Sequence, residues 1–314
     1  MIKTVILCLT DSCNLNCKKC YVNRVVNDFD IVKVLRGLKI LFRENNIRKV
    51  IFHGGEPLMI GKKNFVDVAS YVRKLSPSVS LSVQTNVTLI DREWIDIFKK
   101  FNFSVGVSYR GYRDLFEELS GGGSYDDFLN GIRLLREHGL LSGSIFYFPS
   151  EYRDVVCDNL ERIVDDIVEL GLRNVDIHES VERGKIENFS DIVIGAQEYI
   201  FKKGYSLRIR ELDMIYRLVS GRPGSKVCSW AHNCYNFIAL SGNGDFYRCN
   251  RRPMNYRVLY DECLTCPIFG LCEGGCETVR EMNDGKNPYC DDRIRMYKYV
   301  VENLNKFYLH YDFL

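Results

Sequence analysis

Short apolar, β-branched runs alternate with longer amphipathic stretches between residues 3 and 178, and this alternation constrains the fold more than any other feature. Short runs of this kind predict strands, and apolar residues three or four positions apart predict helices. Because a parallel strand pair needs a long crossover connection, strand–helix units in succession favour parallel strands with right-handed crossovers. We therefore expect an α/β fold, either an open barrel or a doubly wound sheet.

The expected strands are Lys3–Leu9, Lys49–His53, Ser80–Gln84, Ser104–Ser108, Ser144–Phe148 and Asn174–His178. The expected helices are Ile31–Glu44, Lys63–Leu75, a helix from the cap Asp91 to Lys100, Tyr125–His138 after the cap Ser124, Asp154–Leu170, and a closing helix Ile294–Phe307. Gly139 and Gly171 follow two of these helices and are typical C-terminal stops.

The pattern changes after residue 205, which predicts further regions of the chain. Residues 206–227 contain Gly221, Pro223 and Gly224 and are expected to form a linker. Residues 228–290 hold eight of the thirteen cysteines and few long apolar runs. A segment of this kind has a small core, so bound metal would have to stabilise it. Residues 291–314 then contain the closing helix.

Composition limits the class of protein. A formal net charge of +2 does not favour nucleic acid or an anionic membrane as a partner. The apolar start is too short for a signal peptide, and no apolar run approaches the roughly 20 residues of a membrane span. We expect a cytoplasmic protein, where thiols stay reduced and thirteen cysteines are more typical of metal ligands than of disulfides.

Cys13, Cys17 and Cys20 follow the first expected strand in a C-x3-C-x2-C pattern. They should lie at the carboxyl end of that strand, where α/β sheets place their active sites. Three thiolates can hold a [4Fe–4S] cluster by three irons and leave the fourth iron open, which is typical of a catalytic metal site. The alternatives are a zinc site with a fourth ligand from elsewhere, or a chance cluster.

The segment HGGEP, residues 53–57, follows the second expected strand. Its glycines would let the backbone approach a ligand closely, and the Glu56 carboxylate could bind an ammonium group. Together, CNLNCKKCY and HGGEP resemble the radical S-adenosylmethionine enzymes. SVQTNVTL (82–89) and VGVSYRG (105–111) resemble the third and fourth strands of that family.

The resemblance implies an open (β/α)6 partial barrel over residues 1–205. It also implies that Cys13, Cys17 and Cys20 bind a [4Fe–4S] cluster, with S-adenosylmethionine on the fourth iron. The cofactor-binding residues implied in the same way are Gly54, Gly55, Glu56, Thr85, Asn86 and Ser108. Two positions depart from the family: Arg110 stands where an aspartate is usual, and Glu118 where relatives tend to place an arginine near the cofactor.

The C-terminal cysteines resemble the SPASM module of anaerobic sulfatase-maturing enzymes and peptide maturases, with Gly244 five residues before Cys249. The resemblance implies two auxiliary [4Fe–4S] clusters. Without it, two interleaved zinc sites would explain the C-x2-C spacing equally well. The implied ligands are Cys228, Cys234, Cys249 and Cys276 for one cluster, and Cys263, Cys266, Cys272 and Cys290 for the other.

The implied function is that of an oxygen-sensitive enzyme that generates a 5′-deoxyadenosyl radical and modifies a side chain of a peptide or protein. Oxidative cross-linking (thioether or carbon–carbon) of a ribosomally made peptide is the leading expectation. Epimerisation and oxidation to formylglycine are the alternatives, and a zinc or iron–sulfur electron-transfer module is the non-enzymatic one. The expected partners are the peptide substrate and a flavodoxin or ferredoxin electron donor, with a separate peptide-recognition protein as a further candidate.

Residues that act on the substrate are harder to identify. The sequence begins at its first expected strand, so we expect the barrel mouth, the linker near Arg222 or a partner protein to capture the substrate. His53 and His178 fall near strand ends, and His178 with Glu179 could contact substrate. Cys8 and Cys157 are expected to be structural thiols, with hydrogen-atom donation to a substrate radical as the alternative.

Asn250 bears on the choice of reaction. In the sulfatase-maturing relatives that the module resembles, an aspartate follows the cysteine matching Cys249, and those relatives have a tyrosine where this chain has Val22. An asparagine amide cannot take up a proton as a carboxylate does. We therefore expect a reaction other than formylglycine formation.

Overall fold

The structure is a computed structural model that describes residues 2–22, 29–178, 185–224, 230, 234–249, 263, 265–281, 283 and 286–313. The chain divides into two compact units. The first comprises Met1–Ser108, Phe116–Ser142 and Cys234–Pro253, and the second Tyr109–Leu115, Gly143–Asn233 and Met254–Leu314. Among the described residues, no helix is long and apolar enough to cross a membrane.

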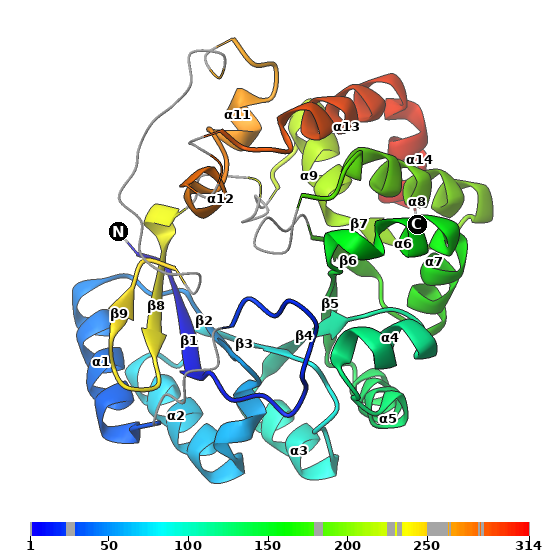
Figure 1. Ribbon diagram of the computed structural model, residues 1–314. Coiled ribbons are helices and arrows are strands. Elements are labelled where there is room, and N and C mark those ends of the chain that lie inside the picture. Colours follow the sequence, from blue (N-terminus) through cyan, green and yellow to red (C-terminus); the bar gives the residue numbers. More distant parts are fainter. Residues whose placement is uncertain are drawn as a thin grey trace. The chain divides into compact units, whose positions relative to one another are not determined.

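A sheet forms the centre of the first unit. Its strands lie in the order β4 (Phe103–Tyr109), β3 (Ser80–Thr85), β2 (Lys49–Gly54), β1 (Thr4–Thr10), β8 (Phe237–Ser241) and β9 (Phe246–Tyr247) (Figure 1). All neighbours are parallel except β8 and β9, which form an antiparallel pair. Parallel pairing brings the carboxyl ends of β1 to β4 to one edge of the sheet.

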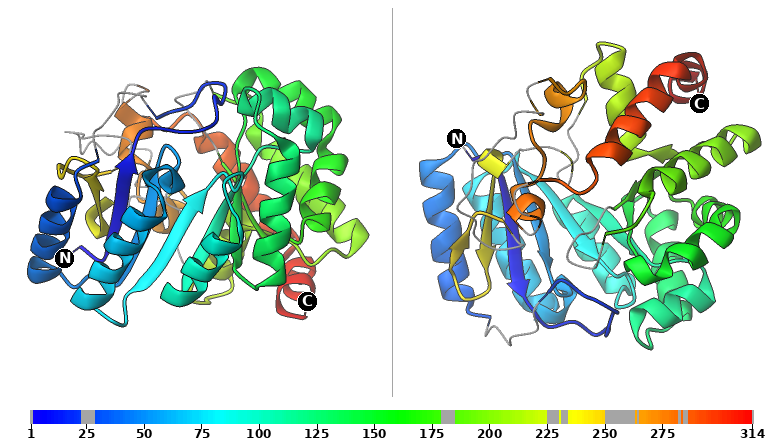
Figure 2. Two further views of the ribbon diagram at one scale, coloured as in Figure 1. Left: turned by 90° about the horizontal axis from the view of Figure 1, so that it is seen from below. Right: turned by 45° about the horizontal axis from the view of Figure 1, so that its top comes forward.

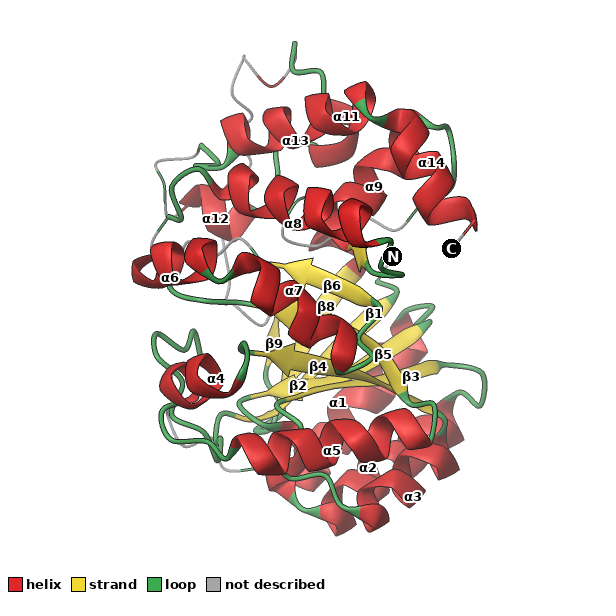
Figure 3. Ribbon diagram, turned by 90° about the vertical axis from the view of Figure 1, so that its right-hand side faces the viewer, coloured by secondary structure: helices red, strands yellow, loops and turns green. Residues whose placement is uncertain are grey.

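Helices cover the face of the sheet to which Val5, Leu7 and Leu9 of β1 point, and these three side chains are fully or almost fully buried. Figure 3 shows helices on one side of strands β2 to β4. Each of three helices begins at a side chain that accepts backbone N–H groups, namely Asp30, Asp91 and Ser124. The helices of this layer are α1 (Ile31–Glu44), α2 (Lys62–Leu75), α3 (Arg92–Phe101) and α5 (Tyr125–Glu137).

The second unit contains a smaller parallel set of strands, β5 (Leu141–Phe146), β6 (Asn174–Ile177) and β7 (Arg208–Ile209). Its helices are α6 (Arg153–Asp158), α7 (Leu160–Glu169), α8 (Phe189–Lys203), α9 (Arg210–Val219), α11 (Phe269–Cys272), α12 (Glu277–Glu281), α13 (Cys290–Glu302) and α14 (Leu304–Phe313). The remaining helix α4 (Arg113–Ser120) and the short 3₁₀ turns Pro57–Ile60, Ser150–Tyr152 and Cys234–Asn236 connect these elements.

Two expected helices are interrupted, and the prediction of continuous helices there is wrong. The stretch Asp154–Leu170 forms α6 and α7, which meet at Asn159, and the closing stretch Ile294–Phe307 forms α13 and α14, which meet at Asn303. At both breaks the asparagine side-chain amide donates to the carbonyl oxygen four residues earlier, over 2.9 Å. The backbone N–H of each asparagine donates to the same oxygen, at 3.2 and 3.1 Å, so side chain and backbone share one acceptor where α6 and α13 end.

The expected linker 206–227 is not entirely irregular, because it contains β7 and helix α9. The glycine- and proline-containing end, residues 221–224, does lie outside any helix or strand. Strand β5 begins three residues before the expected Ser144 and ends at Phe146 rather than Phe148. The other expected strands and helices are confirmed to within a few residues at each end.

Candidate functional site

The loop that carries the three N-terminal cysteines leaves the carboxyl end of β1 (Figure 2, left). The sulfur of Cys13 accepts a hydrogen bond from the Leu15 backbone N–H at 3.4 Å and one from Asn86 Nδ2 at 3.7 Å. Asn86 Nδ2 also donates to Asn14 Oδ1 at 2.9 Å. Asn14 Nδ2 in turn donates to the Thr88 hydroxyl at 2.8 Å. The residues after β3 therefore hold the first cysteine in place.

The other side of this loop rests on the end of α4. The backbone N–H groups of Asn16 and Lys18 donate to the carbonyl oxygens of Ser120 and Leu119 at 3.0 Å. A Cβ on Gly121 would clash with the Asn16 carbonyl, so this close approach needs a glycine. Lys18 Nζ pairs with Glu118 at 2.9 Å. Where the family resemblance would place an arginine, this chain thus has an acid that pairs with a lysine beside Cys17.

Gly54 and Gly55 let the cysteine loop lie directly against the end of β2. The N–H of Gly55 donates to the Thr10 carbonyl at 2.7 Å, and the N–H of Glu56 donates to the Ser12 carbonyl at 2.8 Å. A Cβ on Gly54 would clash with the Thr10 carbonyl oxygen, and one on Gly55 with the Ser12 carbonyl oxygen. Both glycines are therefore required by the packing of the protein on itself.

Glu56 is 1% exposed and lies at the centre of a buried hydrogen-bond network. Its Oε1 accepts from the Leu58 N–H at 3.1 Å and from the Thr85 hydroxyl at 2.8 Å, and its Oε2 accepts from the Asn86 N–H at 2.8 Å. Burial raises the pKa of Glu56 to about 7, although these three hydrogen bonds lower it. A carboxylate accepts up to about four hydrogen bonds, so little capacity is left for a ligand.

Ser108 lies near the carboxyl end of β4. Its hydroxyl accepts a hydrogen bond from Gln84 Nε2 of β3 at 3.1 Å. A Cβ on Gly106 would clash with Gln84 Oε1, so the glycine makes room for this contact. Arg110, which departs from the family pattern, lies with its guanidinium 4.9 Å from the centre of the Tyr147 ring.

That Cys13, Cys17 and Cys20 hold an iron–sulfur cluster stays a prediction, and the structure describes the surroundings of the first of them. Burial raises the pKa of Cys13, the Leu15 N–H lowers it, and the nearby charges of Glu56, Cys17 and Cys20 raise it further. Cys17 and Cys20 thus act electrostatically on Cys13. No three Cys, His, Asp or Glu side chains of the described residues form a group that could hold a metal ion. A cluster differs from such a site because each thiolate binds a different iron.

The cysteine-rich region is divided between the two units. Cys234 and Cys249 flank the β8–β9 pair of the first unit, whereas Cys263, Cys266, Cys272, Cys276 and Cys290 belong to the second. Cys228 lies outside the described residues, so the first implied ligand set stays a prediction. Gly244 turns the chain between β8 and β9 with a φ of 89°, and a Cβ there would lie 2.7 Å from Lys33 Cβ of α1.

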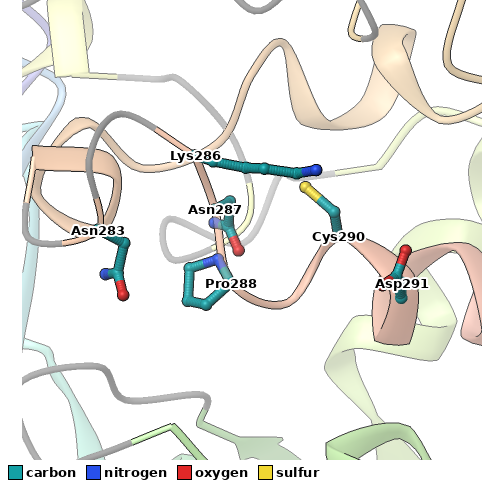
Figure 4. A pocket seen from close by; sticks show the side chains of 6 residues that line it. All are labelled: Asn283, Lys286, Asn287, Pro288, Cys290 and Asp291. Carbon is teal, nitrogen blue, oxygen red and sulfur yellow. The ribbon is translucent and has the colours of Figure 1, made fainter.

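The second implied ligand set also stays a prediction, but all four of its cysteines belong to the second unit and some of them interact. Cys266 donates its N–H to the Cys263 carbonyl at 3.3 Å. Burial raises the pKa of Cys290 to about 11. The charge of Arg293 lowers this pKa, Cys272 and Cys263 raise it, and the charge of Lys286 lowers it. Cys290 therefore lies near two cysteines of its set and two cations. Figure 4 shows the Lys286 amine beside the Cys290 sulfur at a pocket of about 380 Å³.

A buried acidic pair lies at the carboxyl end of β6. Asp176 Oδ1 is 3.3 Å from His178 Nδ1, and Asp176 Oδ2 is 3.5 Å from an Arg210 nitrogen. Burial raises the pKa of Asp176, but His178, Glu211 and Arg210 outweigh it and lower the value to about 2. Burial and the facing Asp176 charge raise the pKa of Glu211 well above its ordinary value. The sequence did not indicate this pair, since Asp176 and Glu211 are far apart along the chain.

The other residues singled out in the sequence have varied surroundings. His53 Nδ1 accepts the Gly54 N–H at 2.8 Å, which is a packing contact. Arg222 pairs with Asp312 and stacks on the rings of Tyr216 and Tyr308, so its charge is already engaged. Burial raises the pKa of the Cys8 and Cys157 thiols. The pKa of Cys8 reaches about 12, because Asp11 and Cys249 raise it further. Glu179 and Asn250 lie outside the described residues, and Val22 ends the described part of the loop.

Comparison with known proteins identifies the family. Residues 7–163, half of the chain, match the model of the Radical SAM superfamily. A serine-type anaerobic sulfatase-maturating enzyme of Klebsiella aerogenes is 22% identical over 94% of this chain and 84% of its own length. An uncharacterized protein of Archaeoglobus fulgidus is 32% identical over 43% of this chain, but the match spans only 34% of that protein.

Two solved structures show the same fold. Native anSMEcpe with bound AdoMet and the Cp18Cys peptide is 18% identical and superposes with a TM-score of 0.77, over 97% of this chain and 98% of that one. Streptococcus suis SuiB bound to the precursor peptide SuiA is 17% identical, with a TM-score of 0.62 over 91% and 74%. The expected α/β fold with a parallel sheet is confirmed. The chain belongs to the radical SAM superfamily of enzymes, whose cofactors are a [4Fe–4S] cluster and S-adenosylmethionine.

Proposed function

We propose that this enzyme modifies a side chain of a peptide or protein. The observation that carries the proposal is the three-cysteine loop, held at the carboxyl ends of β1, β2 and β3 by the Glu56–Thr85–Asn86 network. The choice of substrate is supported by the relatives, which include a sulfatase-maturating enzyme and two solved structures that hold peptides. The proposed substrate is thus a peptide segment rather than a small metabolite.

In this proposal Cys13, Cys17 and Cys20 hold the catalytic cluster, and the strand ends from Gly54 to Ser108 line the S-adenosylmethionine site. When bound, these cofactors supply a carbon-centred radical that removes a hydrogen atom from the substrate. The role of the protein is to orient: Asn86 donates to the Cys13 sulfur, and Glu56 fixes Asn86 and Thr85. The eight C-terminal cysteines, in the two sets implied by the sequence, would hold auxiliary clusters.

Oxidative cross-linking is the specific reaction that we propose. Asn250 lacks the carboxylate that formylglycine formation would use as a base, so we favour a cross-link whose proton acceptor, where a thiol must be deprotonated, is another residue. Formylglycine formation is the second candidate, because the relatives named above include a sulfatase-maturating enzyme over 94% of this chain. The Asp176–His178 pair would be an alternative proton acceptor for that reaction.

The proposal also covers partners and location. A flavodoxin or ferredoxin would supply the electron that starts each turnover. Because Arg222 is engaged by Asp312, substrate capture is better assigned to the strand ends or to a separate peptide-recognition protein. A cytoplasmic location is part of the proposal, since thirteen reduced cysteines need a reducing compartment.

The test is anaerobic reconstitution with iron, sulfide, S-adenosylmethionine and candidate peptides. We expect 5′-deoxyadenosine and a peptide that has lost two hydrogen atoms and does not react with a hydrazide. Cys17→Ala should abolish 5′-deoxyadenosine formation, whereas the control Cys157→Ala, on α6, should not. A hydrazide-reactive product from a sulfatase-motif peptide would establish formylglycine formation instead. Near-wild-type cofactor cleavage by Cys17→Ala would contradict the cluster assignment.

A further inference from the structure

A fully buried arginine contacts one of the predicted ligands of the second auxiliary cluster. Arg293 lies one turn after Cys290 on α13 and is 0% exposed. One guanidinium nitrogen donates to the Cys272 sulfur at 3.3 Å and to the Trp230 carbonyl at 3.1 Å. The guanidinium carbon also lies 4.9 Å from the centre of the Trp230 ring. A rigid cation is therefore fixed against a cysteine sulfur.

Further hydrogen-bond donors gather at the same place. A Cβ on Gly275 would lie 2.9 Å from Arg293 Nη1, 3.1 Å from Asn287 Nδ2 and 3.5 Å from the Cys272 sulfur, so all three surround this glycine. Asn287 Nδ2 and Trp230 Nε1 are buried and have no acceptor among the described residues. Buried donors are normally satisfied, so the Asn287 amide near the Cys272 sulfur suggests that an acceptor belongs there.

The contact between Arg293 and Cys272 suits a ligand sulfur of an iron–sulfur cluster. A cysteine that binds a cluster is a thiolate, and its sulfur would accept a charge-assisted hydrogen bond from the guanidinium. Cys272, Cys290, Arg293, Asn287 and Trp230 all belong to the second unit. The surroundings thus fit the cluster that the sequence implies there.

We propose that Arg293 sets the reduction potential of the auxiliary cluster held by Cys263, Cys266, Cys272 and Cys290. The inference rests on the auxiliary-cluster assignment of the proposed function. Reduction adds negative charge to a cluster, and a fixed positive charge with an N–H donor at a ligand sulfur stabilises the reduced form. Arg293 therefore raises the potential and makes this cluster a better electron acceptor.

The experiment measures this potential directly. Cys13→Ala, Cys17→Ala and Cys20→Ala are combined so that only the auxiliary clusters remain, and each couple is followed by electron paramagnetic resonance during a redox titration. In this background we expect Arg293→Gln to lower the equilibrium constant for reduction of one cluster at least tenfold. For a one-electron couple this is a decrease in reduction potential of about 59 mV. Arg293→Lys should restore most of the difference, and the other cluster should not change.

Arg295→Gln is the matched control, because Arg295 lies on the same helix and pairs with Asp191 at 2.6 Å rather than with a cysteine. An iron-loaded Arg293→Gln protein with unchanged potentials would overturn the inference. If Arg293→Gln loses iron, the result for Arg293→Lys distinguishes the two explanations. An Arg293→Lys protein that keeps its iron and a near-parental potential supports the charge effect. Loss of iron from Arg293→Lys as well would show that Arg293 has a packing role instead. A parental protein without auxiliary iron would overturn the cluster assignment as well.

Discussion

Asp176 and Glu211 are buried carboxyl groups that face each other but differ in what else they contact. Asp176 also faces His178 and Arg210, which favour its ionised form. Glu211 accepts a long hydrogen bond from the Ile177 N–H at 3.4 Å, and its Oε1 has no hydrogen-bond partner among the described residues. The pKa shifts in opposite directions follow from these contacts, and Glu211 stays protonated well above its ordinary pKa.

Glu211→Gln, which mimics the protonated carboxyl, should remove a pH dependence of stability. The raised pKa means that Glu211 stabilises fully below its unfolded pKa, and that this contribution is lost as the pH rises toward the folded value. Relative to the glutamine variant, the wild type should lose at most about 1.4 kcal/mol per pH unit above about pH 5. Melting temperatures from pH 5 to pH 8 measure the difference.

The control is Glu137→Gln, whose exposed carboxylate on α5 pairs with Arg133. Asp176 does not affect the comparison between pH 5 and pH 8. Because its pKa is lowered to about 2, its contribution to the free energy of unfolding is complete above about pH 4 and is lost only as the pH falls toward 2. A wild type and Glu211→Gln variant whose melting temperatures stay parallel over this range would show that Glu211 is not protonated in the fold.

At the residue scale, the sequence indicated which residues gather at the strand ends but not what they contact. The prediction placed Glu56 near the cysteines, but that its oxygens bind Thr85 and Asn86 depends on contacts 29 and 30 residues away in the chain. The pairing of Glu118 with Lys18 joins residues 100 positions apart. Local spacing carries no information on such contacts, so these roles needed the structure.

At the element scale, capped helices and β-branched strands could be predicted because their signals are local. Asp91 and Ser124 begin α3 and α5 as expected. The breaks at Asn159 and Asn303 were missed, because an asparagine within an amphipathic pattern does not by itself show whether its side chain competes for a backbone carbonyl. The pairing of β8 with β1 was missed because it is a long-range parallel contact.

The β8–β9 pair should depend on Gly244. Gly244→Ala would place a Cβ 2.7 Å from Lys33 Cβ at a positive φ, whereas Gly139→Ala has a positive φ but open space around it. Both variants carry left-handed strain of about 1 kcal/mol, and Gly244→Ala should cost about 1–3 kcal/mol more from the clash. Denaturant unfolding of the two variants measures this. Equal losses would mean that α1 does not pack against this turn.

At the scale of the whole molecule, the cysteine-rich region does not form one unit of its own but is divided between the two units. The sequence suggested one cysteine-rich region over residues 228–290, but β8 and β9 with Cys234 and Cys249 belong to the first unit. Ligand spacing along the chain predicts which cysteines share a site, yet it does not show which sheet each segment joins. That depends on burial, since Ala239 and Leu240 of β8 are buried beside β1.

Loss of the second auxiliary site should therefore unfold one part of the chain selectively. Among the residues between Cys263 and Tyr289 that the structure describes, the helices are the short α11 and α12, so bound metal should supply much of the stability of this segment. We expect Cys272→Ser to lower the melting temperature by about 10 °C, since each kcal/mol lost shifts it by about 2–4 °C in a unit of this size. Hydrogen exchange should show lost protection between Cys263 and Arg293 but not in β1 to β3.

Cys157→Ser is the control, because that thiol lies on α6 and belongs to neither predicted ligand set. Unchanged exchange between Cys263 and Arg293 in Cys272→Ser would show that side-chain packing, such as the Arg293–Trp230 stack, holds this segment without metal.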